Sequence, residues 1–175
     1  IDWIVDQCER LRQWPEAGRM VLDVGGASGV FAGLFTKREW NCTVVDPSVE
    51  GKFIETDLGI PYIACPIGEA EVSGEFHLVS MNYVLEHLLD PMSTLEGTKK
   101  ALRPDGLLFI EVPDASNFKH LPLDHDIFNA CHLWMFDCDS LGGVLEHAGY
   151  RILVTKTLDV LRGHKGLMVL AEQCA

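Results

Sequence analysis

A carboxylate stands directly before a glycine-rich turn near the start of the chain. The segment reads Val21-Leu22-Asp23-Val24-Gly25-Gly26-Ala27-Ser28-Gly29. An apolar run that leads into such a turn, and then into a helix, brings backbone N–H groups close to a ligand at the carboxyl end of a sheet. The turn is therefore a candidate cofactor site, although a plain tight turn remains the alternative.

A dinucleotide site fits this turn poorly. The G-x-G-x-x-G pattern, started at Gly25, places Ala27 and Val30 where the second and third glycines belong. Asp23 would also face the negative pyrophosphate of such a cofactor. A carboxylate suits a ligand with positive charge, and S-adenosylmethionine carries an ammonium and a sulfonium but no phosphate. An NAD-dependent oxidoreductase is therefore only the third-ranked hypothesis.

A second carboxylate, Asp46, ends the next apolar run, in Val44-Val45-Asp46-Pro47-Ser48. An acid at this position can accept hydrogen bonds from ribose hydroxyls. NAD sites use the same device, so Asp46 does not discriminate between the two cofactors. The alternative interpretation is that Asp46-Pro47-Ser48 only begins a turn.

Two histidines are candidates for a general base, because imidazoles titrate near neutral pH. His87 follows an apolar run at the cofactor edge, where it could act as a base, line the pocket or merely cap the next helix. His132 precedes the aromatic segment Leu133-Trp134-Met135-Phe136, and we expect it to contact the methyl acceptor.

We expect no metal site. His125, Cys131, His132 and Cys138 offer suitable ligand atoms, but their spacing matches no common zinc pattern. His125, within Asp124-His125-Asp126, is interpreted as a solvated loop residue.

Short apolar runs alternate with helical patterns, which is typical of βαβ units around a parallel sheet. The predicted strands are Met20–Leu22, Cys42–Val45, Ile60–Cys65, Phe76–Met81, Leu107–Val112, Tyr150–Thr157 and Gly166–Ala171. Four helices are predicted: one from the start of the chain to about Trp14, one over Phe31–Lys37, one that begins at Asp90-Pro91, and one over about Ser140–Ala148. A turn is predicted at Arg103–Gly106.

The last two predicted strands are too close in sequence for a crossover helix, so they should pair antiparallel. The expected fold is α/β: a doubly wound, seven-stranded, mostly parallel sheet with one antiparallel strand near the C-terminus and helices on both faces.

The composition of the 175 residues indicates one domain over 1–175, and the first residue, Ile1, suggests an excerpt from a longer chain. With 26 acidic and 14 basic side chains, the net charge of −12 argues against nucleic-acid binding. No apolar run reaches the roughly 18–20 residues that span a bilayer. Six scattered cysteines are interpreted as reduced thiols of a cytoplasmic protein.

Taken together, these segments resemble the Rossmann-like S-adenosylmethionine-dependent methyltransferases from Val21 to Ala171. The glycine turn is similar to the family's D-x-G-x-G-x-G loop, with Ala27 in place of the middle glycine. Two further similar segments are Tyr83-Val84-Leu85-Glu86-His87-Leu88-Leu89-Asp90-Pro91 and Leu102-Arg103-Pro104-Asp105-Gly106-Leu107. The segment His132-Leu133-Trp134-Met135-Phe136 resembles the branch with ubiquinone-pathway and sugar methyltransferases.

The resemblance implies S-adenosylmethionine as cofactor and a set of residues that hold it. These are Asp23, Gly25, Gly26, Ala27, Gly29, Asp46, Pro47, Glu69 and Asn82. Glu69 falls where the family often has an acid beside the adenine amino group. Tyr83 stands where ubiquinone-pathway relatives have a Glu that helps bind a divalent ion, so a metal site of that kind is not expected.

The expected function is methyl transfer from S-adenosylmethionine to a small-molecule acceptor, such as a sugar, quinol or polyketide-like compound, by in-line displacement. His87 and His132 are the candidate catalytic residues. The alternative is a catalytically idle cofactor-binding or partner-binding module of a larger protein.

Overall fold

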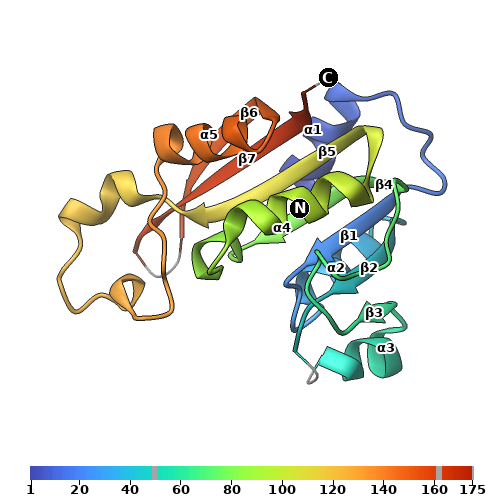
Figure 1. Cartoon of the computed structure of the whole chain (residues 1–175), viewed down its shortest axis with the longest axis horizontal. Helices are drawn as coiled ribbons and strands as arrows, with labels where there is room; N and C mark the ends of the chain where they lie inside the picture. The colour runs from blue at the N-terminus through green and yellow to red at the C-terminus, as the bar shows by residue number, and fades with distance from the viewer. Residues whose placement is uncertain (49–50, 161–162, 175) are drawn as a thin grey trace.

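The computed structural model describes residues 1–48, 51–160 and 163–174 and is built around a seven-stranded sheet in the order β3-β2-β1-β4-β5-β7-β6 (Figure 1). The strands are β1 (Met20–Val24), β2 (Asn41–Val45), β3 (Tyr62–Ile63), β4 (Phe76–Asn82), β5 (Leu102–Pro113), β6 (Tyr150–Asp159) and β7 (Lys165–Gln173). β7 pairs antiparallel with both of its neighbours, and the other pairs are parallel. The predicted fold class and its reversed strand are confirmed.

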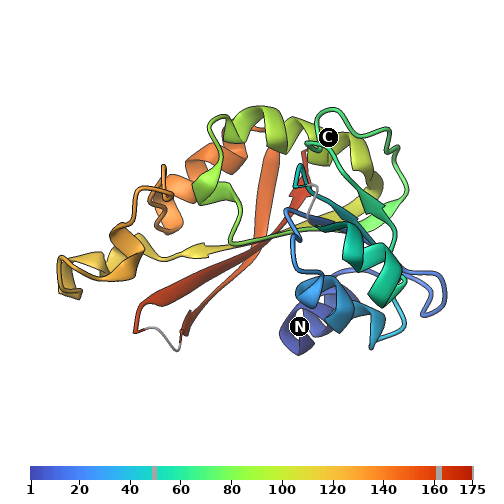
Figure 2. The ribbon, with the colours of Figure 1, turned by 90° about the horizontal axis from the view of Figure 1, so that it is seen from below.

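Helices cover both faces of the sheet (Figure 2). They are α1 (Asp2–Leu11), α2 (Val30–Thr36), α3 (Lys52–Leu58), α4 (Pro91–Ala101) and α5 (Cys138–His147), with 3-10 turns η2 (Leu85–His87), η3 (Ala115–His120) and η4 (Asp126–Phe128). One core cluster packs α4 and α5 on one face, and a second packs α1, α2 and α3 on the other. This is a doubly wound arrangement.

Side-chain caps start two of the helices. Asp90 accepts a hydrogen bond from the Ser93 backbone N–H at 3.1 Å, and Pro91 occupies the first helical position of α4, as predicted. Asp137 and Ser140 cap each other's backbone N–H groups at the start of α5. Because Asp137 is the cap, α5 begins at Cys138, slightly earlier than predicted.

The predicted turn at Arg103–Gly106 is wrong, because β5 begins at Leu102 and runs through this segment. Leu102 pairs with Phe76, and a register shift between Phe76 and Leu78 accommodates the irregular stretch. The segment before β1 also contacts this part of β5, since the Trp14 indole N–H donates to Asp105 Oδ2 at 2.9 Å. These contacts override the turn preference of Pro and Gly.

Two further predictions between β2 and β4 need correction. The strand predicted over Ile60–Cys65 shrinks to Tyr62–Ile63, where it pairs with the end of β2. Helix α3 has no predicted counterpart, and it ends at Gly59, whose φ of +65° favours glycine.

The strand order places the candidate site. The chain leaves β1 for β2 and β3 on one side and returns to β4 on the other side of β1. A crevice therefore opens at the carboxyl ends of β1 and β4, the usual ligand position in such sheets. Beyond the end of β5, the segment from η3 to α5 projects away from the sheet, drawn in yellow and orange (Figure 1).

Candidate functional site

The glycine turn follows β1 in a conformation that requires glycine. Gly25 and Gly29 have φ values of +73° and +65°. A Cβ on Gly25 would lie 2.6 Å from Val84 Cγ2, and one on Gly26 would lie 2.4 Å from Asp23 Oδ2. The backbone thus packs directly against the carboxylate that precedes it.

Asp23 is buried, and one of its two carboxylate oxygens has no hydrogen-bond partner among the described residues. Its Oδ1 accepts from Ser80 Oγ at 2.8 Å, whereas Oδ2 has no partner among the residues described. Burial raises the pKa of Asp23 to about 7. Asp23 lines a cavity of about 150 Å³ together with Gly25, Gly26, Ala27, Ser28, Phe31 and Asn82. A cation in this cavity would offset the cost of burying the carboxylate.

Asp46 directly follows the last residue of β2 and is 6% exposed. Its Oδ1 accepts from the Ser48 backbone N–H at 2.7 Å, a hydrogen bond typical of a turn. The ribose role of Asp46 stays a prediction. The negative charge of Asp46 contributes to the raised pKa of Asp23, because the two carboxylates are close enough to repel each other. Neither Asp46 nor the exposed Pro47 lines the small cavity.

The other two predicted cofactor residues differ in their placement. Asn82 ends β4 and lines the small cavity, and its Oδ1 is buried without a partner in the described chain. Glu69 lies exposed in a turn after β3 and does not line that cavity. Asn82 is therefore brought to the glycine turn, whereas the role of Glu69 stays a prediction.

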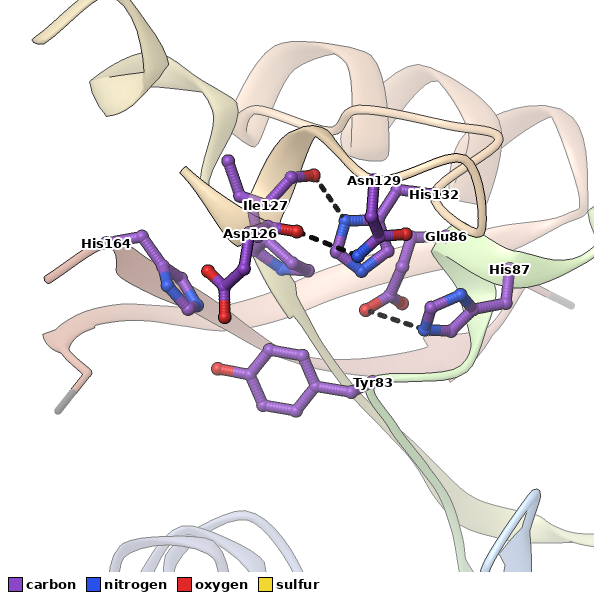
Figure 3. A pocket seen from close by; sticks show the side chains of 9 residues that line it. Tyr83, Glu86, His87, Asp126, Ile127, Asn129, His132 and His164 are labelled. Carbon is purple, nitrogen blue, oxygen red and sulfur yellow. Dashed lines mark hydrogen bonds and ion pairs between the residues drawn. The ribbon is translucent and has the colours of Figure 1, made fainter. Parts of the chain in front are cut away.

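A larger cavity of about 420 Å³ lies beyond Asn82 and brings the two predicted histidines together (Figure 3). Its lining residues are Tyr83, Glu86, His87, Pro113, Asp126, Ile127, Asn129, His132 and His164. The ring centroids of His87 and His132 are 4.8 Å apart although the residues are distant in sequence. The projecting segment after β5 folds back over η2 to form this contact.

Backbone carbonyls orient both imidazoles. His87 Nδ1 lies 2.8 Å from the Cys131 carbonyl oxygen, and His132 Nδ1 lies 2.6 Å from that of Ile127. Because a carbonyl only accepts, we assign the proton to Nδ1 in each ring, which leaves a lone pair on Nε2. Each neutral ring then has one nitrogen able to take a proton or bind a metal.

Glu86 is a site residue that the sequence reasoning missed. It is 1% exposed, and neither carboxylate oxygen accepts a hydrogen bond from the residues described. Burial raises its pKa to about 7. Its backbone oxygen accepts from the N–H groups of Leu133 at 2.8 Å and Trp134 at 3.2 Å, which fastens η2 to the projecting segment. The sequence feature that could have pointed to Glu86 is its position next to His87. That position does not distinguish a buried acid from an exposed one.

Glu86, His87 and His132 form a donor set that could hold a divalent ion, since one ligand atom from each lies within 4.8 Å of the others. His125, Asp126 and His164 form a second such group. Cys131 and Cys138 are exposed and belong to neither group, unlike in the cluster considered from sequence.

The prediction that His125 is solvated is wrong. Its side chain is only 12% exposed. Its Nδ1 accepts from the Ile127 backbone N–H at 3.1 Å, and its ring lies edge-on to His164 with centroids 5.8 Å apart. The η4 turn draws the ring inward, because the side chain caps that turn.

Tyr83 adopts a left-handed backbone conformation with φ +55° directly after β4. Such a conformation costs about 1–3 kcal/mol for a bulky residue. It is held by the Tyr83 backbone N–H, which donates to the Glu111 carbonyl at 2.8 Å. Tyr83 lines the larger cavity, and its chain neighbour Asn82 lines the smaller one.

Residues 4–155 match the methyltransferase domain family. The chain belongs to this family. The methyltransferase domain is 29% identical over 152 residues to the C-methyltransferase NovU of Streptomyces niveus, which covers 83% of this chain and 36% of NovU. It is 31% identical over 104 residues to a ubiquinone biosynthesis O-methyltransferase of Actinobacillus pleuropneumoniae, which covers 53% and 44%. The chain thus spans less than half the length of these curated relatives.

A solved structure of similar fold is 1,6-didemethyltoxoflavin-N1-methyltransferase of Burkholderia thailandensis, with bound 1,6-didemethyltoxoflavin and S-adenosylhomocysteine. The TM-score is 0.73 at 21% identity, over 91% of this chain and 72% of that one. None of the helices described in this chain is both long and apolar enough to cross a membrane.

Proposed function

We propose that this domain transfers the methyl group of S-adenosylmethionine to a small-molecule acceptor by in-line displacement, with His87 or His132 as general base. The observation that carries the proposal is that two consecutive residues, Asn82 and Tyr83, line two unlike cavities. One contains Asp23, whose Oδ2 has no hydrogen-bond partner among the described residues, beside the glycine turn. The other contains two imidazoles, each with an available nitrogen. A donor site that joins an acceptor site is what the reaction requires.

The donor set around the glycine turn fits S-adenosylmethionine. Asp23 Oδ2 would accept from the ammonium of the amino-acid tail, while Gly25, Gly26, Ala27 and Gly29 bring backbone close to it. Asn82 offers an unpaired amide oxygen to the same tail. In this proposal Asp46 accepts from the ribose hydroxyls beside Pro47, and Glu69 accepts from the adenine amino group. The bound cofactor supplies an electrophilic methyl group on its sulfonium.

The histidine pair would remove a proton from a hydroxyl, amine or carbon acid as the acceptor attacks. Glu86 Oε1 lies 3.9 Å from His87 Nε2, where its negative charge would stabilise the imidazolium that forms. The cavity of about 420 Å³ is in the usual range for small-molecule sites. We expect no nucleic-acid substrate at a net charge of −12, and the six free cysteines favour a reducing compartment such as the cytoplasm.

A cofactor-binding module without turnover of its own is the second candidate. It is favoured by the curated relatives, which extend well beyond the region that this chain matches. Both candidates treat residues 1–175 as one domain that binds the cofactor, and they differ only in turnover.

The experiment has two stages. S-adenosylhomocysteine binding is measured by calorimetry, and labelled-methyl transfer from S-adenosylmethionine to the low-molecular-weight fraction of a cell extract is then followed. The His87→Asn and His132→Asn variants are compared with His147→Asn, an exposed residue on α5 that lines neither cavity. We expect transfer by the wild type and His147→Asn and a loss of at least about a hundredfold in at least one of the other two, which identifies the base. Binding without transfer would support the module, and no binding would exclude both.

A further inference from the structure

Tyr83 presents a polar group to the acceptor cavity that the proposed reaction has not used. Its side chain lines the cavity, and its hydroxyl points toward Asp126 and His164 (Figure 3). The hydroxyl is buried, and its oxygen accepts no hydrogen bond in the part of the chain that the structure describes. A ligand that donates a hydrogen bond to this oxygen would therefore be stabilised there.

Gly166 and Glu111 form the surroundings of this hydroxyl. Gly166 lies on β7 opposite Pro113 of β5. A Cβ on Gly166 would lie 3.0 Å from the Tyr83 hydroxyl oxygen and 3.2 Å from Glu111 Oε1. The hydroxyl and the carboxylate therefore face the same point above the glycine, and any side chain at this position would displace them.

The polarity of this pair selects the kind of group that it can bind. An ionised carboxylate only accepts hydrogen bonds, so Glu111 is placed to take the phenolic proton of Tyr83. The tyrosine oxygen is then left as an acceptor for a donor from outside. The carboxylate of Glu86 in the same cavity, which accepts no hydrogen bond from the described residues, is also an acceptor.

We propose that Tyr83, positioned by Glu111 across Gly166, is a specificity subsite that binds a hydroxyl or N–H donor of the methyl acceptor. This deepens the proposed function and rests on it. Tyr83 contacts the acceptor, and Glu111 acts through Tyr83 as a positioning residue. The subsite favours acceptors that present a free hydroxyl or amine to it over their ethers.

Phenol and anisole are the probes, because they have similar shapes and only phenol can donate a hydrogen bond. Their binding to the protein saturated with S-adenosylhomocysteine is measured by ligand-observed NMR titration. We expect the wild type to bind phenol about three- to tenfold more tightly than anisole. Tyr83→Phe should remove this preference while it leaves anisole affinity unchanged.

Two matched pairs separate the subsite from a merely structural role. Gly166→Ala should lower phenol affinity, whereas Gly143→Ala, at a glycine with no atom within 4 Å of an added Cβ, should not. Glu111→Gln keeps an acceptor oxygen and should retain more of the phenol preference than Glu111→Leu.

Equal binding of phenol and anisole by the wild type, no phenol binding, or an unchanged preference in Tyr83→Phe would overturn the proposal. S-adenosylhomocysteine binding by each variant confirms that it is folded. Failure of the wild type to bind S-adenosylhomocysteine would instead count against the proposed function. In that case phenol and anisole are titrated against the protein without S-adenosylhomocysteine, and the same comparison with Tyr83→Phe tests the subsite.

Discussion

Replacing Asp23 by Asn tests whether the carboxylate before the glycine turn is kept for a cation. The two side chains have nearly the same shape, and the Asn oxygen can still accept from Ser80 Oγ, which lies 2.8 Å from Oδ1 in the native protein. The substitution removes only the ability to ionise. Any change in stability or binding therefore reports on the charge of Asp23.

The magnitude follows from the pKa of Asp23, which burial raises from 3.8 to about 7. Between these values the native state keeps a proton that the unfolded state has lost, so native stability falls as pH rises through this range. A shift of this size corresponds to about 4 kcal/mol, lost fully above pH about 7. Asp23→Asn does not pay this penalty, so we expect it to exceed the wild type in stability at pH 8 by up to about 4 kcal/mol and to match it near pH 4.

Binding should change in the opposite direction. The ammonium of S-adenosylhomocysteine needs ionised Asp23, so wild-type affinity should fall about tenfold per unit of pH below 7, with release of a proton on binding. Asp23→Asn should bind at least about a hundredfold more weakly at pH 8 and lose this pH dependence. Urea unfolding and calorimetry from pH 5.5 to 8 measure both quantities. A wild-type affinity that is flat over this range, or a variant that binds normally, would refute the reasoning.

Three further outcomes are expected. Gly26→Ala should lower S-adenosylhomocysteine affinity at least about tenfold in calorimetry, because the new Cβ would lie 2.4 Å from Asp23 Oδ2, whereas Gly33→Ala meets no atom within 4 Å and should bind normally. Glu86→Gln should be stabilised by about 1–3 kcal/mol at pH 8 but not at pH 4, because burial raises the pKa of the native carboxyl to about 7; equal urea midpoints at pH 8 would contradict this. Asp137→Ala should lose about 1 kcal/mol of unfolding free energy with its cap on α5, and an unchanged melting temperature would count against the cap.

Local patterns were sufficient for much of the fold. Alternating apolar runs and helical periods predicted the strands of the sheet, and the short connection before Gly166 predicted the antiparallel end. Asp90 and Pro91 marked the start of α4 correctly. These features depend on residues that are close in sequence, whose preferences act before any long-range contact forms. The acid and glycines of the first turn belong to the same group.

The chemistry of the acceptor cavity depended on contacts between distant segments. The ring contact of His87 with His132 exists because the chain after β5 folds back over η2, and no local pattern contains that return. The raised pKa of Glu86 arises from the same covering, which removes water from a side chain that could as well be exposed. Arg103–Gly106 likewise has the composition of a turn but lies in β5, where the preceding residue Leu102 pairs with Phe76 of β4. The sequence thus determines which chemical groups the protein contains. Their burial and their contacts with distant side chains, and therefore their charge and reactivity, follow from the packing of the whole chain.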